Sequence, residues 1–275
     1  MISIAALQEN ILKLCSHMKL PLSISSPPNK GQKMTPIAET TVLGKSVNHD
    51  YAEHGYCVIT MPEVPQSLLN SFNDMPRDMH SLGRLREIRL TQYIGYWEAN
   101  EWVFAPLPQR KYVQSAHYIR LAEAGGVARH REQIVGDPTM LIAAVLDELP
   151  VDLTQMFQIN VNQIRVTANA DYKGITVPEG PHRDGHEFSV IAIAKRSNVK
   201  GGETQVIDPQ TREVLFRTTL AENQAILIDD ERFIHYASNI EPEEGDIGYR
   251  DIWVIEINRW KNRAYGPTHE QASMA

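Results

Sequence analysis

The clearest hydrophobic pattern lies in the C-terminal half of the chain, where short apolar or alternating segments are separated by turn residues. The segments are rich in Ile, Val, Phe and Thr, which favour strands. They read MFQINVNQIRVTA, EFSVIAIAK, ETQVID, EVLFRTT, QAILID and RDIWVIEIN. Several short strands at this spacing predict a sandwich or a barrel-like jelly roll. We expect this β core at about residues 155–260.

Helical patterns cluster in the first half of the chain. Residues 2–20 carry apolar side chains at helical spacing, which predicts an amphipathic helix: Ile4, Leu7, Ile11, Leu14 and Met18. The following segment, PLSISSPPNKGQKMTP, has no periodicity and is typical of a linker. We therefore expect an N-terminal helix and a Pro/Ser-rich linker over residues 1–47, and a compact domain over residues 48–275.

Two further segments predict helices that pack outside the β core. In MPEVPQSLLNSFNDM, Pro65 precedes an apolar pair and would occupy the first turn of a helix. In GDPTMLIAAVLDELP, Asp137 is a candidate cap, Pro138 a first-turn residue and Pro150 the stop. The predicted fold class is mainly β with flanking helices, an α+β arrangement around a jelly roll.

Composition narrows the function classes. The chain has 275 residues, a hydrophobic content of 42% and a net charge of -7. An acidic balance disfavours a nucleic-acid partner, because binding phosphates requires a basic surface. Two cysteines, no secretory signal and no apolar run of about 20 residues predict a cytoplasmic protein that does not enter a membrane. A homo-oligomer is left open.

The segment GPHRDGHEFSVIAIAK concentrates ionisable side chains at the mouth of an apolar strand. His182, Asp184 and His186 stand two apart, and side chains two apart share one face of a strand. Leaving them unpaired in a protein interior would cost about several kcal/mol, so they need a partner, and a metal ion is one candidate. Mononuclear non-haem iron takes two histidines and one carboxylate, with the other positions open.

A second histidine would come from a distant strand. LIDDERFIHYASNI supplies His235, directly after an apolar strand and a charged turn. Fifteen residues later, GYRDIWVIEIN brings Arg250 onto the next strand. A guanidinium there could form a two-pronged contact with the distant carboxylate of a metal-bound ligand.

This constellation resembles the Fe(II)/2-oxoglutarate-dependent dioxygenase superfamily. The resemblance is strongest to a bacterial branch that hydroxylates free amino acids, of which isoleucine 4-hydroxylases are typical. It rests on HRDGHEFSVIAIAKRSNVKGGETQVID, FIHYASNI and YRDIWVIEINR, and covers roughly residues 48–260.

The resemblance implies a double-stranded β-helix, which is a jelly roll, and a set of catalytic residues. His182, Asp184 and His235 would bind Fe(II), and Arg250 would pair with the far carboxylate of 2-oxoglutarate. O2 would take the remaining position, and the co-substrate would leave as succinate and CO2. Thr204 could point at the co-substrate, although a threonine in a strand needs no such role.

Candidate substrate residues follow from position and charge. Gln163 and Arg165 share a face with the apolar stripe of their strand, and could hold the substrate or lie on an edge strand facing solvent. Arg86 could bind a substrate carboxylate or lie on a solvated face. His186 could face the substrate, support a ligand or be solvated, because a fourth protein ligand would close the site. Glu187 could receive a substrate ammonium group.

The leading hypothesis is a dioxygenase that hydroxylates an unactivated C–H bond of a free L-amino acid or close derivative. One alternative keeps the mechanism on a peptide-bound or other small-molecule scaffold. A second alternative is a jelly-roll protein that binds metal without turnover, and a zinc hydrolase would have no need of Arg250.

Overall fold

The computed structural model describes residues 48–81 and 85–275, so the helix and linker predicted within residues 1–47 lie outside the described part. The fold is mainly β, with 41% strand and 16% helix. This confirms the predicted fold class and agrees with a jelly-roll core.

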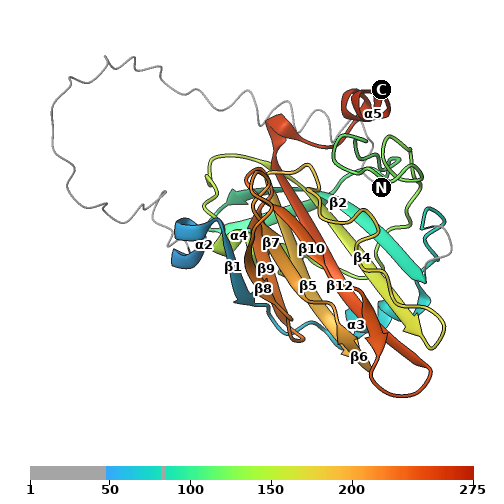
Figure 1. The fold of residues 1–275 in the computed structure, drawn as a ribbon. Helices are drawn as coiled ribbons and strands as arrows, with labels where there is room; N and C mark the ends of the chain where they lie inside the picture. Colours follow the sequence, from blue (N-terminus) through green and yellow to red (C-terminus); the bar gives the residue numbers. More distant parts are fainter. Residues whose placement is uncertain (1–47, 82–84) are drawn as a thin grey trace, which may run out of the picture. The chain divides into compact units, whose positions relative to one another are not determined.

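A seven-stranded antiparallel sheet is the largest element of the fold, in the order β1-β9-β5-β12-β4-β2-β3 (Figure 1). Its strands are β1 (Tyr56–Thr60), β2 (Arg86–Glu98), β3 (Glu101–Pro106), β4 (Phe157–Asn169), β5 (Phe188–Ser197), β9 (Gln224–Asp229) and β12 (Ile247–Arg259). Four of them match segments predicted from the sequence. β1, β2 and β3 come from the chain before residue 155, and β2 is long because its two faces are both buried.

Two small antiparallel sheets complete the described β structure. One has the order β10-β7-β8 and the other pairs β11 with β6. Their strands are β6 (Val199–Gly201), β7 (Thr204–Ile207), β8 (Val214–Thr218), β10 (Ile234–Ala237) and β11 (Ile240–Pro242). An isolated antiparallel bridge joins His182 to His235 in β10, so the loop before β5 runs beside the edge of the three-stranded sheet.

Short helices flank the strands: α2 (His49–His54), α3 (Gln66–Asn70), α4 (Thr139–Glu148), α5 (Pro267–Met274) and the 3-10 turns η1 (Ser71–Asp74) and η2 (Trp260–Asn262). The two helices predicted in the domain are present as α3 and α4. Pro65 precedes α3, and Pro138 precedes α4. The Asp137 carboxylate accepts a hydrogen bond from the backbone N–H of Thr139 at 3.0 Å, which anchors the start of α4.

The core has one hydrophobic cluster on each face of the large sheet. On one face the side chains of α4 meet the sheet: Leu141, Ile142, Val145 and Leu146 pack with Ile159, Val161, Trp253 and Ile255. On the other face the large sheet packs against the small sheets through Ile164, Val166, Ile191, Ile252 and Val206. Odd-numbered residues of β4 and β12 therefore face the helices, and even-numbered residues face the small sheets.

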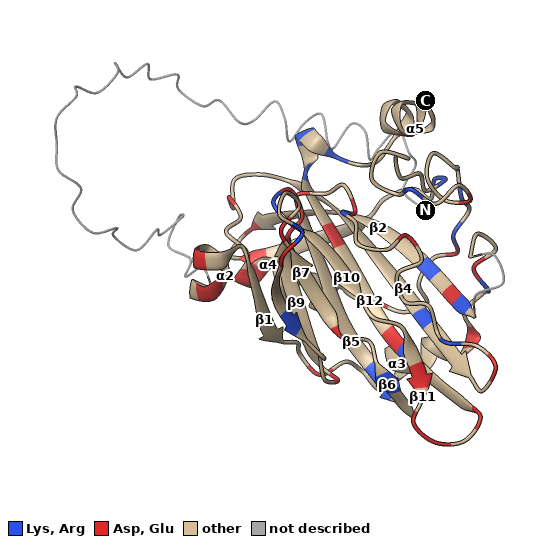
Figure 2. Cartoon of the chain, viewed as in Figure 1, with Lys and Arg blue, Asp and Glu red and all other residues tan. Residues whose placement is uncertain are grey.

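Charged positions interrupt β2, β4 and β12, although these strands are largely buried (Figure 2). Buried charges need partners, so each of these positions requires either a charge pair within the fold or a bound ligand. Cys57 is buried and free. Across residues 48–81 and 85–275, no helix combines the length and the apolar character needed to cross a membrane.

Candidate metal centre and co-substrate site

Two histidines that are distant in sequence lie directly opposite each other. His182 is in the loop before β5 and His235 is in β10. The backbone N–H of His182 donates to the carbonyl of His235 at 3.1 Å, and that of His235 donates back to the carbonyl of His182 at 2.9 Å. This reciprocal pair sets the two imidazole rings 4.7 Å apart between centroids.

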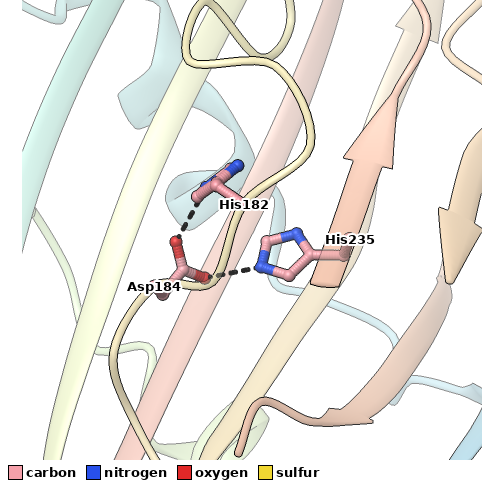
Figure 3. A group of neighbouring side chains, drawn as sticks. All are labelled: His182, Asp184 and His235. Atoms are coloured by element: carbon pink, nitrogen blue, oxygen red, sulfur yellow. Dashed lines mark hydrogen bonds and ion pairs between the residues drawn. The ribbon is translucent and has the colours of Figure 1, made fainter. Parts of the chain in front are cut away.

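Asp184 completes a compact cluster with the two histidines (Figure 3). Its Oδ1 lies 3.2 Å from Nε2 of His182, and its Oδ2 lies 3.2 Å from Nε2 of His235. One potential ligand atom from each residue lies within 4.8 Å of the others. Two imidazole nitrogens and one carboxylate oxygen at this spacing are a donor set that could hold Fe(II).

Neighbouring groups orient these donors. The Nδ1–H of His182 donates to the carbonyl of Gly180 at 2.9 Å, which directs Nε2 towards the cluster. The hydroxyl of Ser189 donates to Oδ2 of Asp184 at 2.5 Å. The carboxylate of Asp230 accepts the backbone N–H groups of residues 184, 185 and 186 at 3.2, 2.8 and 3.0 Å, which fixes the loop that carries the ligands.

The electrostatics of the cluster favour a cation. Burial by itself opposes the ionisation of Asp184, but the charges of His235 and His182 hold the pKa of this carboxyl well below its usual range. Burial also disfavours the charged form of His235 and so lowers its pKa. The Asp184 carboxylate opposes this effect, and the pKa of His235 is raised overall. An ionised carboxylate facing two imidazoles is a site where a divalent cation would replace protons.

Arg250 lies on β12 on the face towards the small sheets and is 1% exposed. Its Nε and Nη2 atoms, and Oγ1 of Thr204 on β7, have no hydrogen-bond partner in the described part of the chain. Burial first, and the charge of Arg196 second, lower the pKa of Arg250 to about 9. Gly202 makes room for it, because a Cβ there would lie 3.3 Å from Cδ of Arg250.

One cavity joins the cluster to these donors. It is lined by all three residues of the cluster and by Thr204 and Arg250. Its walls also include Ile88, Ile164, Ile191 and Ile252, and a polar group of Asp78, Arg86, Arg129 and Arg131. The orphaned donors of Arg250 and Thr204 are a fit for an anionic co-substrate bound next to a metal.

Arg86 lies on the wall of this cavity, as the prediction of a substrate contact requires. It belongs to β2. Its guanidinium donates to the carbonyl of Thr176 at 3.4 Å, and its Nε lies 3.9 Å from Oδ2 of Asp78.

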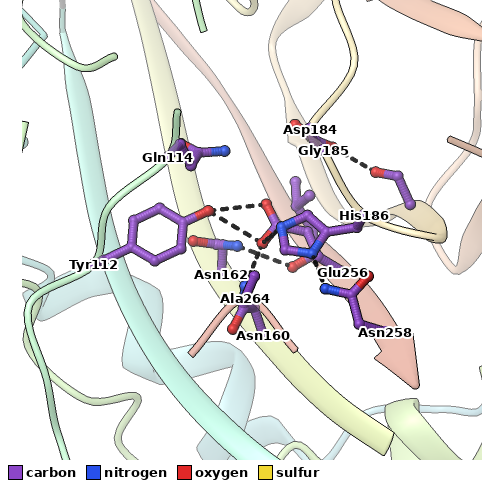
Figure 4. Close-up of polar contacts among 12 residues, drawn as sticks. Tyr112, Gln114, Asn160, Asn162, Asp184, Gly185, His186, Glu256, Asn258 and Ala264 are labelled. Carbon is purple, nitrogen blue, oxygen red and sulfur yellow. Dashed lines mark hydrogen bonds and ion pairs between the residues drawn. The ribbon is translucent and has the colours of Figure 1, made fainter. Parts of the chain in front are cut away.

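His186 turns away from the metal cluster and is held in a buried polar network (Figure 4). Its Nε2 lies 3.1 Å from the Glu256 carboxylate, and its Nδ1 lies 2.8 Å from the side chain of Asn258. Burial lowers the pKa of His186, but the charge of Glu256 raises it overall. The prediction that His186 shares a strand face with Asp184 assumed regular strand alternation. Gly185, at a φ of +87°, interrupts that alternation.

Gln163 and Arg165 lie on the opposite face of β4 from the cavity. The amide of Gln163 donates to the Ser71 hydroxyl at 2.7 Å, under η1. Arg165 makes a two-pronged pair with Asp251, with both N–O distances at 2.7 Å. This corrects the expectation that the two residues bind the substrate. Both faces of β4 are buried, so the alternation of its side chains does not show which face meets the cavity. Only the packing of the folded chain shows it.

Glu187 is also occupied elsewhere. Its carboxylate accepts hydrogen bonds from Arg259 Nε at 2.7 Å and from the Asn262 side chain at 2.6 Å, which joins β5 to the end of β12. It does not line the cavity of the described residues. This corrects the expectation that Glu187 receives a substrate ammonium group.

Several residues of this region could not be recognised from the sequence: Asp230, Glu256, Arg129 and Arg131. Asp230 is one of several acids in LIDDERF, and nothing local distinguishes the one that is buried. Arg129 and Arg131 stand in a segment without strand or helix periodicity, so no pattern predicts which side of the chain they face.

Comparison with known proteins decides the family. The model of the 2OG-Fe dioxygenase family matches residues 69–256, which is more than half of the chain. The chain belongs to the 2OG-Fe dioxygenase family. The dioxygenases of this family use Fe(II), 2-oxoglutarate and O2. The comparison with curated proteins found no match.

Solved structures agree with the fold of this dioxygenase. A bsmA homolog from Methylobium petroleophilum PM1 superposes with a TM-score of 0.62 at 22% identity, covering 82% of this chain and 94% of that one. IDO from Bacillus thuringiensis superposes with a TM-score of 0.58 at 17% identity, covering 84% of this chain and 100% of that one. At these identities the likeness concerns the fold.

Proposed function

We propose that this dioxygenase hydroxylates an unactivated C–H bond of a free L-amino acid or close derivative, with release of succinate and CO2. In this proposal His182, Asp184 and His235 hold Fe(II), and Arg250 with Thr204 holds 2-oxoglutarate. The observation that carries the proposal is one cavity that contains a compact two-histidine, one-carboxylate cluster and a buried arginine with unpartnered donors.

The residues of the chain prepare the site for these groups. When bound, Fe(II) supplies the activation of O2 that couples oxidative decarboxylation of 2-oxoglutarate to C–H hydroxylation. Asp184 provides the negative charge, and the Ser189 hydroxyl holds its Oδ2 in place. The Gly180 carbonyl keeps Nε2 of His182 free of a proton and directed at the metal.

Arg250 and Thr204 would orient the co-substrate. A guanidinium forks onto a carboxylate with two parallel hydrogen bonds, which sets direction as well as affinity. The hydroxyl of Thr204 would donate to the same anion from the small sheet. Apolar side chains around them, Ile164, Ile191 and Ile252, exclude water and so strengthen these contacts.

A free amino acid as substrate is supported by the sequence resemblance to amino acid hydroxylases and by the remaining polar wall of the cavity. An amino acid presents a carboxylate, which needs a cation that is not already occupied by 2-oxoglutarate. Arg86 and Arg129 line the cavity and serve this need. Fixing the carboxylate would determine which carbon reaches the metal, because misplacement by about 1 Å can cost on the order of a hundredfold in rate.

The test is an incubation of the enzyme with Fe(II), 2-oxoglutarate, ascorbate and each free L-amino acid in turn. Products are identified by mass, and succinate is quantified in the same samples. We expect at least one free amino acid to gain an oxygen atom, with one succinate formed for each product.

The N-acetyl and methyl ester forms of the reactive amino acid are the matched controls. They keep the side chain and remove one terminal charge each, so we expect them to react much more slowly. If they react as well as the free acid, the substrate is a peptide or another scaffold. If succinate forms with none of these compounds, the proposed substrate class is wrong.

A further inference from the structure

Three arginines line the cavity beyond the groups assigned to the metal and the co-substrate: Arg86, Arg129 and Arg131. Arg129 and Arg131 are each 6% exposed, and the side chain of Arg86 is 16% exposed. A buried guanidinium remains charged, so each of them needs a negative or strongly polar partner.

The described partners of these arginines do not balance their charge. Arg131 pairs with Asp78, with Nη1 2.6 Å from Oδ1, and Arg86 lies at 3.9 Å from the same carboxylate. Arg129 donates to the neutral amide oxygen of Gln114 at 2.7 Å and stacks over the Tyr112 ring at 5.0 Å. The arginine cluster, formed by these three arginines and Asp78, therefore holds two more positive charges than negative ones.

Hydrogen bonding gives the same result independently of charge. The Nε atom of each of the three arginines is buried and makes no hydrogen bond with the described residues. The three guanidinium groups also influence one another: burial lowers the pKa of Arg129 most, and the charges of Arg131 and Arg86 lower it further. Unpartnered hydrogen-bond donors and an excess of positive charge at the same position are complementary to an anionic ligand.

Other carboxylates of the cavity do not supply this anion. Asp184 belongs to the metal cluster. Glu256 is already bound by the Tyr112 hydroxyl, the Asn160 amide and His186. Glu179, on the half-buried part of the wall, makes no hydrogen bond within the described residues and offers an acceptor for an ammonium group.

We propose that Arg86, Arg129 and Arg131 form an anion subsite for a substrate with two carboxylates, as in an acidic amino acid. This inference rests on the proposed function, which it narrows to dicarboxylic amino acids. The two carboxylates balance the two surplus charges of the cluster, and Glu179 receives the ammonium group. A side-chain amide has the same shape but leaves one charge of the cluster unbalanced, so the site discriminates acid from amide.

The experiment compares acids with their amides, using L-aspartate and L-glutamate against L-asparagine and L-glutamine. The enzyme carries Fe(II) and saturating 2-oxoglutarate, so that the dicarboxylates cannot compete for Arg250. Binding is read without turnover, as the rise in melting temperature under anaerobic conditions. Turnover is read in air as substrate-stimulated succinate formation. We expect at least one acid to bind and react at least about tenfold better than its amide, a difference of about 1.4 kcal/mol.

Variants assign this preference to the cluster. Arg129→Gln and Arg86→Gln should each raise the KM for the acid at least about tenfold and reduce the preference for acid over amide. Arg129→Lys, which keeps the charge, should retain most of that preference. Arg217→Gln removes a charge from the exposed face of β8 and should behave as the wild type.

Two outcomes would overturn the subsite. One is a melting-temperature rise that is equal for acids and amides in the wild type. The other is an unchanged preference in folded Arg129→Gln and Arg86→Gln. The proposed function is judged separately, because succinate formation with a neutral amino acid would support the oxygenase and reject the dicarboxylic substrate.

Discussion

At the residue scale, Arg250 is the side chain whose environment is hardest to explain without a ligand. It is 1% exposed, two of its nitrogen atoms lack partners in the described chain, and the charge of another arginine, Arg196, adds to burial in lowering its pKa. Burying a charge in this way is unfavourable for folding alone. A bound dianion in the same cavity removes this penalty. Replacing Arg250 should therefore lower the affinity for 2-oxoglutarate without lowering the stability of the protein that lacks the co-substrate.

Arg250→Met tests this role. A charge-assisted contact contributes about 1.5–3 kcal/mol, and each 1.4 kcal/mol or so is a factor of ten, so the affinity for 2-oxoglutarate should fall at least about tenfold. Without co-substrate the variant should melt no lower than the wild type, because it buries one charge less. Arg217→Met on exposed β8 is the control. An unchanged requirement for 2-oxoglutarate in Arg250→Met would mean that another residue anchors it.

The sequence contained enough information to bring the metal-cluster residues and Arg250 into one hypothesis, because each lies in or close to a segment with a recognisable strand pattern. The supporting carboxylates could not be predicted this way. Asp230 and Glu256 act through backbone amides and side chains more than twenty residues away in sequence. Such partners are determined by how β5, β9 and β12 pack, and no local pattern encodes that.

At the element scale, the long strands after residue 155 were predicted, whereas β1, β2 and β3 were not, and the faces of the long strands could not be assigned. β4 and β12 are buried on both sides, with helices on one and the small sheets on the other. Alternation then separates the residues into two sets without saying which set meets the cavity. Arg165 and Gln163 belong to the set under the helices, where Arg165 joins β4 to β12 through Asp251.

Arg165→Met should therefore affect stability rather than catalysis. It leaves Asp251, whose side chain is 4% exposed, without its partner, and breaking a buried pair in this way costs about 3–5 kcal/mol. The double variant Arg165→Met/Asp251→Leu should recover most of this loss, as measured by urea unfolding. A stable Arg165→Met protein that has lost coupling to its substrate would return Arg165 to the active site.

Helix α5 is tied to the preceding loops by a pair between Arg110 and Glu270, in which Nη2 lies 2.8 Å from Oε2. The hydrogen bond from Arg110 lowers the pKa of Glu270, so its contribution is present above the unfolded pKa of about 4.3 and is lost as pH falls through the folded value. The pair is partly solvated, so we expect at most about 1 kcal/mol. Glu270→Gln should be less stable than the wild type at pH 7, and the difference should shrink as the pH falls below about 4.3. A difference that does not change with pH would contradict this cause.

At the scale of the whole molecule, two hydrophobic clusters stabilise the described domain without involving the metal-cluster side chains. These side chains lie at the edge of the fold's packed layers, in a loop and at the start of β10. Function should therefore depend on the metal far more than folding does.

Chelation separates these two dependences. After treatment with EDTA, succinate formation should stop, while the β-rich circular dichroism spectrum and a single cooperative unfolding transition should remain. Adding Fe(II) should restore activity, and Zn(II) should restore none, because zinc has no redox chemistry. Loss of the cooperative transition on chelation would mean that the metal holds the fold together.

The most direct test of the account is an anaerobic titration of the Fe(II)-loaded protein with 2-oxoglutarate, followed by visible absorbance. We expect a weak, saturable charge-transfer band in the wild type, because the keto acid would chelate the iron held by His182, Asp184 and His235. Asp184→Ala should bind less iron and give no band, although it folds. A wild type without the band, or the same band in Asp184→Ala, would contradict the assignment of the metal centre.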